Sequence, residues 1–174
     1  MTAEFSRTVR IDTLGAGPRT IEIEADEAER AALAERFGLV SVERLAADVA
    51  MTRAGEAITA VGTLRAKVTQ SCVATAVPVS ARVEEAFTIL FRPPPEGHAE
   101  EEIELSEQEM DVVFYDGAMV DIGDAVAESL WLGLDPYPRA PDAEAVLREV
   151  GVKSEDEMEA ERVARSPFAA LRKE

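Results

Sequence analysis

The sequence predicts an α+β fold: a twisted, mainly antiparallel β-sheet, open or curled towards a barrel, with helices packed on it. Three observations support this. Segments in which apolar and polar residues alternate follow one another with short turns between them, which favours antiparallel pairing. Two other segments begin with a helix cap and then place apolar residues about four positions apart. Apolar residues make up 47% of the 174 residues, which is enough for one hydrophobic core.

Two strands are predicted at the start of the chain, at residues 4–11 and 19–25. Apolar and polar side chains alternate in both, so each strand has one face for the core and one for water. The connection at 12–18 contains two glycines and a proline, which are typical turn residues. The two strands together look like a hairpin.

The first helix is predicted over residues 27–37. Asp26 can accept hydrogen bonds from the first free backbone amides, and Glu29 stands three residues later, which is the spacing of a capping box. Leu33 and Phe37 lie four residues apart and share one face. The glycine that follows suits the left-handed position just after a helix.

Three long strands follow. Residues 39–51 read as one strand or two bent ones, and residues 58–72 continue after a turn. Val61 is out of phase with the inward-facing set of that strand and stands next to Gly62, which predicts a bulge there. The odd-numbered residues of 77–91 are almost all apolar, so this segment is one long strand or two collinear ones.

The second half of the chain begins with an acidic segment at about 96–110, which we expect to be a mobile loop because few apolar side chains are available to dock it. Residues 111–117 return to the sheet. A second helix over 121–133 is capped by Asp121 or Asp124, and Pro136 excludes a helical conformation at Asp135.

Two short helices are expected near the C-terminus: residues 142–150, and a segment that starts with a capping box of Ser154 and Glu157. We therefore expect one α+β domain over residues 1–153, which includes the acidic loop, and a peripheral, partly mobile segment over 154–174. The predicted core includes Ile21, Ile23, Leu33, Phe37, Leu64, Val68, Val79, Phe87, Ile89, Val126 and Leu130.

The charge of the chain is strongly negative, with 35 acidic residues against 18 lysines and arginines, a net charge of −17 and a pI near 4.4. Such a charge repels nucleic acid and anionic lipid and favours basic protein partners, although acidity also simply increases solubility. The single cysteine, Cys72, fits a reducing cytoplasm. The N-terminus lacks the pattern of a secretory signal, and no segment is apolar enough to span a membrane.

Catalytic and metal-binding patterns are few. The only histidine, His98, lies in the acidic segment, and no Ser-His-Asp set is present. A structural zinc site needs three or four Cys or His ligands, and the chain offers only Cys72 and His98. EF-hand, P-loop and dinucleotide-binding patterns are absent. We therefore expect no enzyme activity, no metal and no cofactor.

Three segments, taken in this order and spacing, resemble one known family. They are "VTQSCVATAVPV" with "EEAFTILFRP" (68–79 and 84–93), "VDIGDAVAESLWLGLDPYPRAP" (120–141) and "SPFAALRK" (166–173). Together they resemble the YceD family of large ribosomal RNA subunit accumulation proteins, and its alphaproteobacterial members in particular. The resemblance runs over nearly the whole chain.

The resemblance implies a cytoplasmic bacterial protein linked to the production or stability of large-subunit ribosomal RNA. The family's gene commonly lies beside that of a small large-subunit ribosomal protein, and no catalytic residues can be carried over. Many members have a Cys-x-x-Cys motif, which is Cys72-Val73-Ala74-Thr75 in this chain, and they can add His or Cys after the position of Arg139. Residues 140–150 contain neither, so any metal site of other members is lost here.

The charge and the resemblance together suggest an accessory factor that binds a basic ribosomal protein or a ribonuclease. The Asp135–Pro138 segment ends the second helix, and its two prolines hold an extended stretch that either pins the chain or serves as a recognition edge. The predicted partner-binding residues are Trp131, Asp135, Tyr137, Arg139 and Phe168. One alternative is direct RNA binding through a basic patch of Arg7, Arg10, Arg65 and Lys67. Another is an RNA-processing or hydrolytic enzyme.

Overall fold

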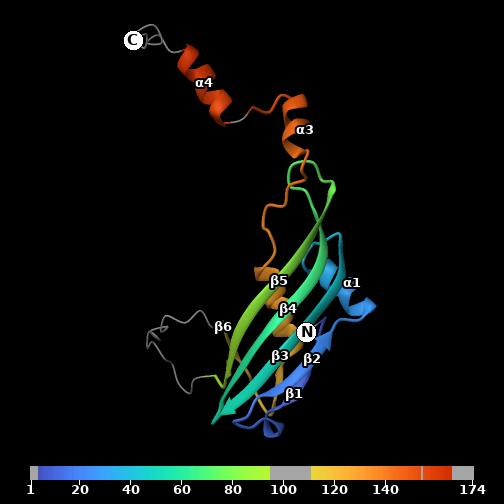
Figure 1. The fold of residues 1–174 in the computed structure, drawn as a ribbon, viewed down its shortest axis with the longest axis vertical. Coiled ribbons are helices and arrows are strands. Elements are labelled where there is room, and N and C mark those ends of the chain that lie inside the picture. The colour runs from blue at the N-terminus through green and yellow to red at the C-terminus, as the bar shows by residue number, and fades with distance from the viewer. Residues whose placement is uncertain (1–3, 95–110, 154, 166–174) are drawn as a thin grey trace. The chain divides into compact units, whose positions relative to one another are not determined.

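The computed structural model describes residues 4–94, 111–153 and 155–165 (Figure 1). It confirms the predicted combination of a mainly antiparallel sheet with helices. In chain order the elements are β1 (Thr8–Arg10), the short 3-10 helix η1 (Ile11–Thr13), β2 (Arg19–Glu24), α1 (Glu27–Arg36), β3 (Ser41–Ala54), β4 (Ala57–Ser71), β5 (Pro78–Arg92), β6 (Asp111–Phe114), β7 (Met119–Asp121), α2 (Ile122–Leu132), α3 (Ala143–Glu149) and α4 (Glu155–Arg165).

The main sheet has five strands in the order β2-β3-β4-β5-β6. β2 and β3 pair antiparallel, as do β3 and β4, whereas β6 runs parallel to the end of β5, with Ile89 opposite Asp111. Within the described residues the sheet is open, with β2 and β6 at its edges, so it does not close into a barrel.

The predicted hairpin of the first two strands is wrong. β1 pairs with β7 in a separate two-stranded sheet, with Val9 opposite Val120, and β2 pairs with β3 over six residues. Val9 and Val120 are both buried, and η1 turns the chain between β1 and β2. A core contact between distant segments therefore decides the pairing, and a local turn pattern cannot show it.

The predicted bulge at Val61 is absent from the pairing of β3 with β4. The β3–β4 register is continuous there and shifts instead between Val42 and Arg44. The structure gives Gly62 a different role, because a Cβ atom at this position would lie 2.4 Å from the backbone oxygen of Asp48 and 2.7 Å from the Phe87 ring. Gly62 is therefore required for close packing of the sheet.

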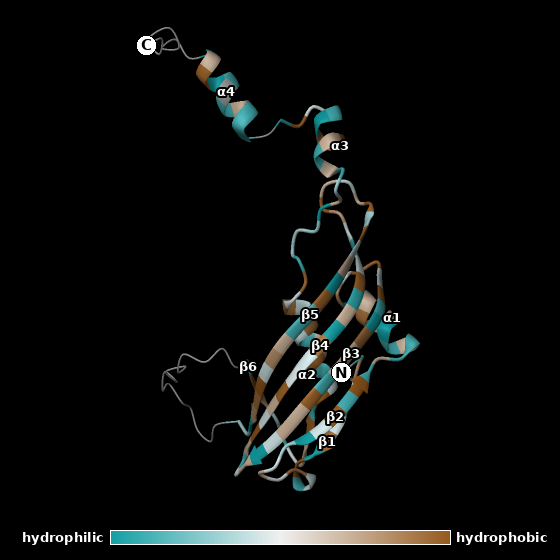
Figure 2. Cartoon of the chain, in the orientation of Figure 1, coloured by the Kyte–Doolittle hydropathy of each residue, from teal (hydrophilic) through white to brown (hydrophobic). Residues whose placement is uncertain are grey.

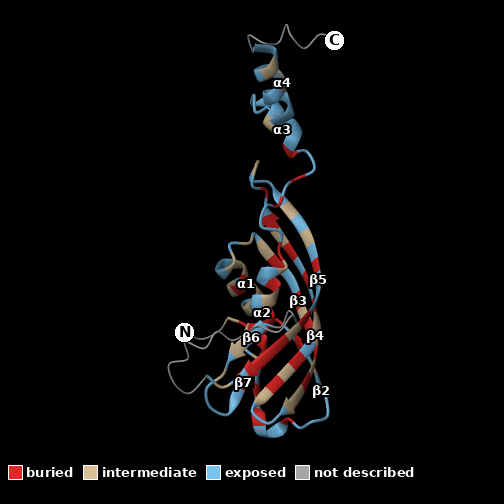
Figure 3. Ribbon diagram, turned by 90° about the vertical axis from the view of Figure 1, so that its left-hand side faces the viewer, coloured by how far each residue is buried: buried red, intermediate tan, exposed pale blue. Residues whose placement is uncertain are grey.

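Helices α1 and α2 cover one face of the main sheet, and the core lies between them and the strands (Figure 3). Brown and teal alternate along β3 and β4 in Figure 2, as the half-buried strands were predicted to do. The predicted core residues that are buried are Ile23, Leu33, Leu64, Val68, Phe87, Ile89, Val126 and Leu130. Those that are only partly buried are Ile21, Phe37 and Val79.

The start of α2 is held by its cap and by the chain before β1. The Asp121 carboxylate accepts hydrogen bonds from the backbone amides of Gly123 and Asp124, as predicted, and also from that of Arg7 at 2.8 Å. A Cβ atom on Gly123 would lie 2.7 Å from backbone atoms of Phe5 and Arg7. The chain before β1 therefore crosses directly over the first turn of α2.

The chain divides into two compact units, and each is described here by itself. The first comprises residues up to Gln70 and from Ser80 to Pro136, and the second comprises Ser71–Val79 and the chain from Tyr137 onward. The domain boundary predicted near residue 153 stays a prediction. The acidic loop with His98, and residues 154 and 166–174, lie outside the described residues. None of the described helices is long and apolar enough to cross a membrane.

Candidate functional site

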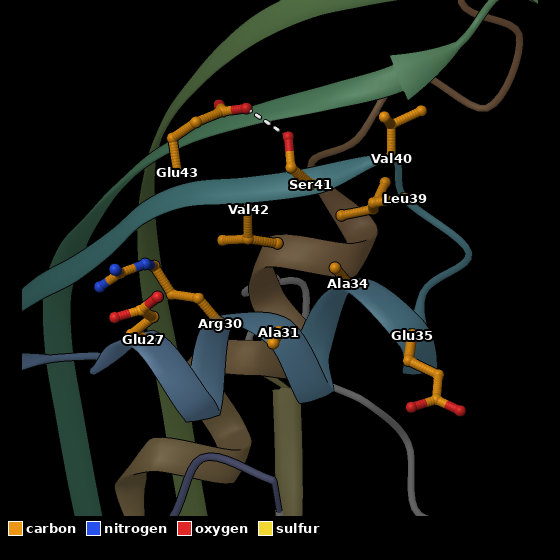
Figure 4. A pocket seen from close by; sticks show the side chains of 10 residues that line it. All are labelled: Glu27, Arg30, Ala31, Ala34, Glu35, Leu39, Val40, Ser41, Val42 and Glu43. Carbon is orange, nitrogen blue, oxygen red and sulfur yellow. Dashed lines mark hydrogen bonds between the residues drawn. The ribbon is translucent and has the colours of Figure 1, made fainter.

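A groove of about 630 Å³ lies between α1 and the beginning of β3 (Figure 4). The pairing of β2 with β3 ends at Ala46 of β3. Residues 41–45 of β3 therefore have no β2 residue beside them, and α1 lies near them instead. The apolar residues of this groove, which we call the helix groove, are Ala31, Ala34, Leu39, Val40 and Val42. Val40 is 55% exposed, so part of this apolar surface faces solvent.

The charged residues of the helix groove are three glutamates and one arginine. Glu27, Glu35 and Glu43 face solvent around the apolar surface. Arg30 donates a hydrogen bond to the backbone oxygen of Ala25 at 2.7 Å, which holds its guanidinium at the start of α1. The groove therefore has a net negative charge beside an apolar floor.

Glu43 is held in its charged form. Desolvation would raise the pKa of its carboxyl group, but hydrogen bonds donated by the hydroxyls of Ser41 and Thr69, at 2.5 and 2.7 Å, together lower that pKa. The nearby positive charge of Lys67 lowers it further. Figure 4 shows the Glu43 side chain pointing away from α1, on the side of β3 opposite Val42.

Trp131 lies at the C-terminal end of α2 and is half exposed. Its ring stacks on Phe37 of the first helix, with 5.3 Å between the ring centroids and 23° between their planes. The guanidinium of Arg36 lies over the same Phe37 ring and pairs with Glu4 at 2.9 Å and with Asp124 at 3.0 Å. Trp131 is therefore a positioned aromatic group that still offers 51% of its surface to a partner.

The side of β5 that faces away from β4 is a second surface beside α2. β6 pairs only with residues 89–92, so residues 80–88 have no described strand on that side. We call these residues the β5 edge. A hollow of about 200 Å³ beside it is lined by Glu85 and Phe87, by Asp111 of β6, and by Leu132 of α2. Leu132 is 71% exposed.

In the second unit, Cys72 lies in the turn between β4 and β5. Its sulfur accepts a hydrogen bond from the backbone amide of Ala140 at 3.3 Å. The pKa of the thiol is lowered to about 7, first by the nearby Thr75 hydroxyl and then by the backbone amide of Ala140. Cys72 packs in a small apolar cluster with Ala140 and Ala143. The structure thus places Thr75 close to the Cys72 sulfur.

The structure divides the predicted partner-binding residues between the two units. Trp131 and Asp135 belong to the first unit, where the backbone oxygen of Asp135 accepts a hydrogen bond from Gln70 at 2.9 Å. Tyr137 and Arg139 belong to the second, where Tyr137 is 72% exposed and Arg139 lines a hollow with Glu144 and Arg148. Phe168 lies outside the described residues.

The predicted RNA patch is also divided. Arg65 and Lys67 share the sheet face that the helices leave uncovered, since Leu64, Ala66 and Val68 of the same strand point into the core. Arg10 lies in the two-stranded sheet and pairs with Asp12 at 2.5 Å. Arg7 lies beside α1, where it forms two hydrogen bonds with Glu29, at 2.5 and 2.8 Å.

Carboxylates lie close to these basic residues. Besides the partners of Arg7 and Arg10, Asp48 lies 2.6 Å from Arg65. Phosphate contacts by three of the four residues would therefore compete with intramolecular ion pairs. Among the residues that the structure describes, no three His, Cys, Asp or Glu side chains are grouped as metal ligands.

Sequence reasoning missed the residues of the helix groove and of the β5 edge. A signal for the groove is present in α1: Glu27, Ala31 and Glu35 stand four residues apart and form one row on the helix, with a small residue between two acids. The β5 edge has no such signal, because the length of β6 and its parallel pairing are decided by the tertiary structure.

A protein-family model described as "Large ribosomal RNA subunit accumulation protein YceD" matches residues 60–173. A search of curated proteins and a search of solved structures found no match. The family match begins within β4 and includes β5 and α2, whereas every residue of the helix groove precedes it. The comparison therefore bears on Trp131 and the β5 edge, and not on the helix groove.

Proposed function

The chain belongs to the YceD family of large ribosomal RNA subunit accumulation proteins, and on this basis we propose that it is a non-enzymatic accessory factor for accumulation of large-subunit ribosomal RNA or for ribosome assembly. It acts in the cytoplasm by binding a basic ribosomal or RNA-processing protein. Binding such a protein reconciles a role in RNA metabolism with a net charge of −17, which disfavours contact with RNA itself.

The observation that carries this proposal is the coincidence of exposed apolar residues with carboxylates in the part of the chain that the family match covers. Trp131 and Leu132 are 51% and 71% exposed at the end of α2. Glu85 and Asp111 line the hollow beside Leu132. An aromatic anchor with acidic neighbours suits a basic protein surface, because the apolar contact gives affinity and the charges speed association.

Affinity purification after nuclease treatment tests the proposal. We expect the tagged chain, at moderate salt, to retain basic large-subunit ribosomal proteins or a ribonuclease after all RNA has been digested. Cells without the chain should show a lowered ratio of large- to small-subunit ribosomal RNA, which the wild-type chain restores. Recovery of ribosomal RNA alone, released completely by nuclease, would instead support the RNA-binding alternative and overturn the proposal.

Trp131→Ala tests the contact surface. We expect it to weaken binding of the retained protein about tenfold, as truncation of a central aromatic anchor does. Trp131→Phe is the matched control, since it keeps a ring against Phe37. Circular dichroism should show both variants folded, and unchanged binding by Trp131→Ala would place the contact elsewhere.

A further inference from the structure

We propose that the β5 edge binds an extended, lysine- or arginine-bearing segment of the partner protein, which pairs with β5 as an added strand of the sheet. This inference rests on the proposed function and names the binding mode and the partner's chemistry. Strand addition obtains affinity from main-chain hydrogen bonds and specificity from alternate side chains.

The backbone groups of β5 that face the open side can be identified. The backbone oxygen of Arg92 accepts a hydrogen bond from the amide of Tyr115, which follows β6, so Arg92 faces that side. The backbone groups of successive residues point to opposite sides of a strand. The buried side chains of Val83, Phe87 and Ile89 show that the odd residues stay on the core face along this part of β5. The amides and carbonyls of Glu84 and Ala86, and the amide of Thr88, therefore face the open side, where no described strand pairs with them.

This edge lacks some of the features that usually block pairing. Proline and lysine residues protect many edge strands, and residues 80–88 contain neither. By contrast, the part of β3 beyond the end of β2 has a bulge next to Arg44 and has α1 nearby. Glu84, Glu85 and Ala86 are all exposed, although alternation would direct Glu85 towards the core face.

An apolar contact is available beside the edge. Leu132 projects from α2 and is 71% exposed, and it lines the same hollow as Phe87. Gly133 allows this close approach, since a Cβ atom there would lie 3.0 Å from Glu85 and 3.1 Å from Val83. An apolar side chain on the core face of an added strand would therefore cover Leu132.

The charges select a basic segment over a second copy of this chain. Glu84, Glu85 and Asp111 lie along the edge or at its end, whereas Arg82 is the only basic residue of 80–88. Arg65 reaches Glu84 at 3.5 Å across an exposed surface, where such a pair is weak. Edge-to-edge pairing of two copies would bring the glutamates of both together, which is unfavourable. Lysine or arginine residues on an added strand would remove this repulsion.

Amide hydrogen exchange of the full chain tests the inference, with a synthetic peptide that alternates lysine and valine as the probe. We expect the peptide to slow exchange at Glu84, Ala86 and Thr88, which association by charge alone would not do. A peptide that alternates glutamate and valine should have no effect. Amides at these positions that already exchange slowly before the peptide is added would mean that the edge is occupied, and would overturn the inference.

Ala86→Pro gives a second test, because it removes one donor on the open side and leaves the pairing with β4 intact. We expect lysine–valine peptide binding to fall about tenfold or more. Thr20→Pro in β2, the other edge strand, is the matched control. The amide of Ala25 donates to Leu45 of β3, so the odd residues of β2 bond to β3 and the backbone amides of even residues such as Thr20 point away from the sheet. Equal losses in both variants, or none in Ala86→Pro, would contradict strand addition at β5.

A charge variant separates the two acidic surfaces. Glu84→Lys should weaken peptide binding, whereas Glu35→Lys in the helix groove should not; the reverse result would assign binding to the groove. If the full chain retains basic ribosomal proteins equally with and without Ala86→Pro, the strand-addition inference fails and the proposed function stands. If the wild-type chain binds the peptide but retains no basic protein from cells, the proposed function fails.

Discussion

At the scale of single residues, the chemistry of this chain is decided by neighbours from distant parts of the sequence. Cys72 is the clearest case, because Ala140 contributes a backbone amide to its sulfur from 68 residues away. Arg7 behaves in the same way, since Glu29 holds its guanidinium and both partners are partly buried. A residue type can be read from the sequence, but its charge state and availability depend on such contacts.

The thiol of Cys72 should titrate near neutral pH. Its pKa is lowered from 9.0 to about 7 by the Thr75 hydroxyl and by backbone amides, so we expect thiolate absorbance near 240 nm to appear with a midpoint close to pH 7. The lowered pKa stabilises the folded chain above pH 9, and this contribution is lost as the pH falls through 7. Thr75→Val should raise the midpoint, and Cys72→Ser, as the control, should abolish the signal. A midpoint near 9 in the wild type would contradict the hydrogen bonds.

At the scale of elements, the local signals were reliable wherever they concerned helices. The capping box of Asp26 and Glu29 is formed with both of its hydrogen bonds, and α1 ends within one residue of the prediction. The predicted helices at 121–133 and 142–150 correspond to α2 and α3. The antiparallel pairing of consecutive strands was predicted correctly for β2, β3 and β4. The first strand is shorter than predicted and pairs with β7, because its pairing depends on the rest of the fold.

Loss of the α1 cap should destabilise the chain measurably. Asp26→Ala leaves the amide of Glu29 without its acceptor, and we expect the free energy of unfolding to fall by about 1 kcal/mol. Urea denaturation followed by circular dichroism measures it. Asp26→Ser is the control, because a serine hydroxyl can accept the same hydrogen bond and should keep most of the stability. Equal losses in both variants would show that the cap is not the cause.

At the scale of the whole molecule, negative charge dominates. The ion pairs among the described residues are mostly exposed, such as Arg65 with Asp48 and Arg10 with Asp12, and exposed pairs contribute little. We therefore expect self-repulsion of a chain with a net charge of −17 to outweigh them and to oppose the compact state. The same charge that favours a basic partner thus reduces the stability of the isolated chain.

Salt should stabilise the isolated chain at neutral pH. Sodium chloride screens the repulsion between carboxylates, so we expect the melting temperature to rise by a few degrees between low and moderate ionic strength. A variant in which exposed Glu22 and Glu24 are replaced by glutamine should show a smaller rise. A fall in melting temperature with salt would mean that the ion pairs outweigh the repulsion.

The sequence by itself determined the fold class, the helices with their caps, most of the buried strand faces and the family, because these follow from local spacing, composition and short motifs. Only the tertiary structure decided that β1 pairs with β7, that α1 and β3 enclose an acidic groove, and that no described strand pairs with residues 80–88 on the side of β5 away from β4. Each of these depends on contacts between segments far apart in the chain. No periodicity within one segment records such contacts, since their energy arises only when distant surfaces are buried together.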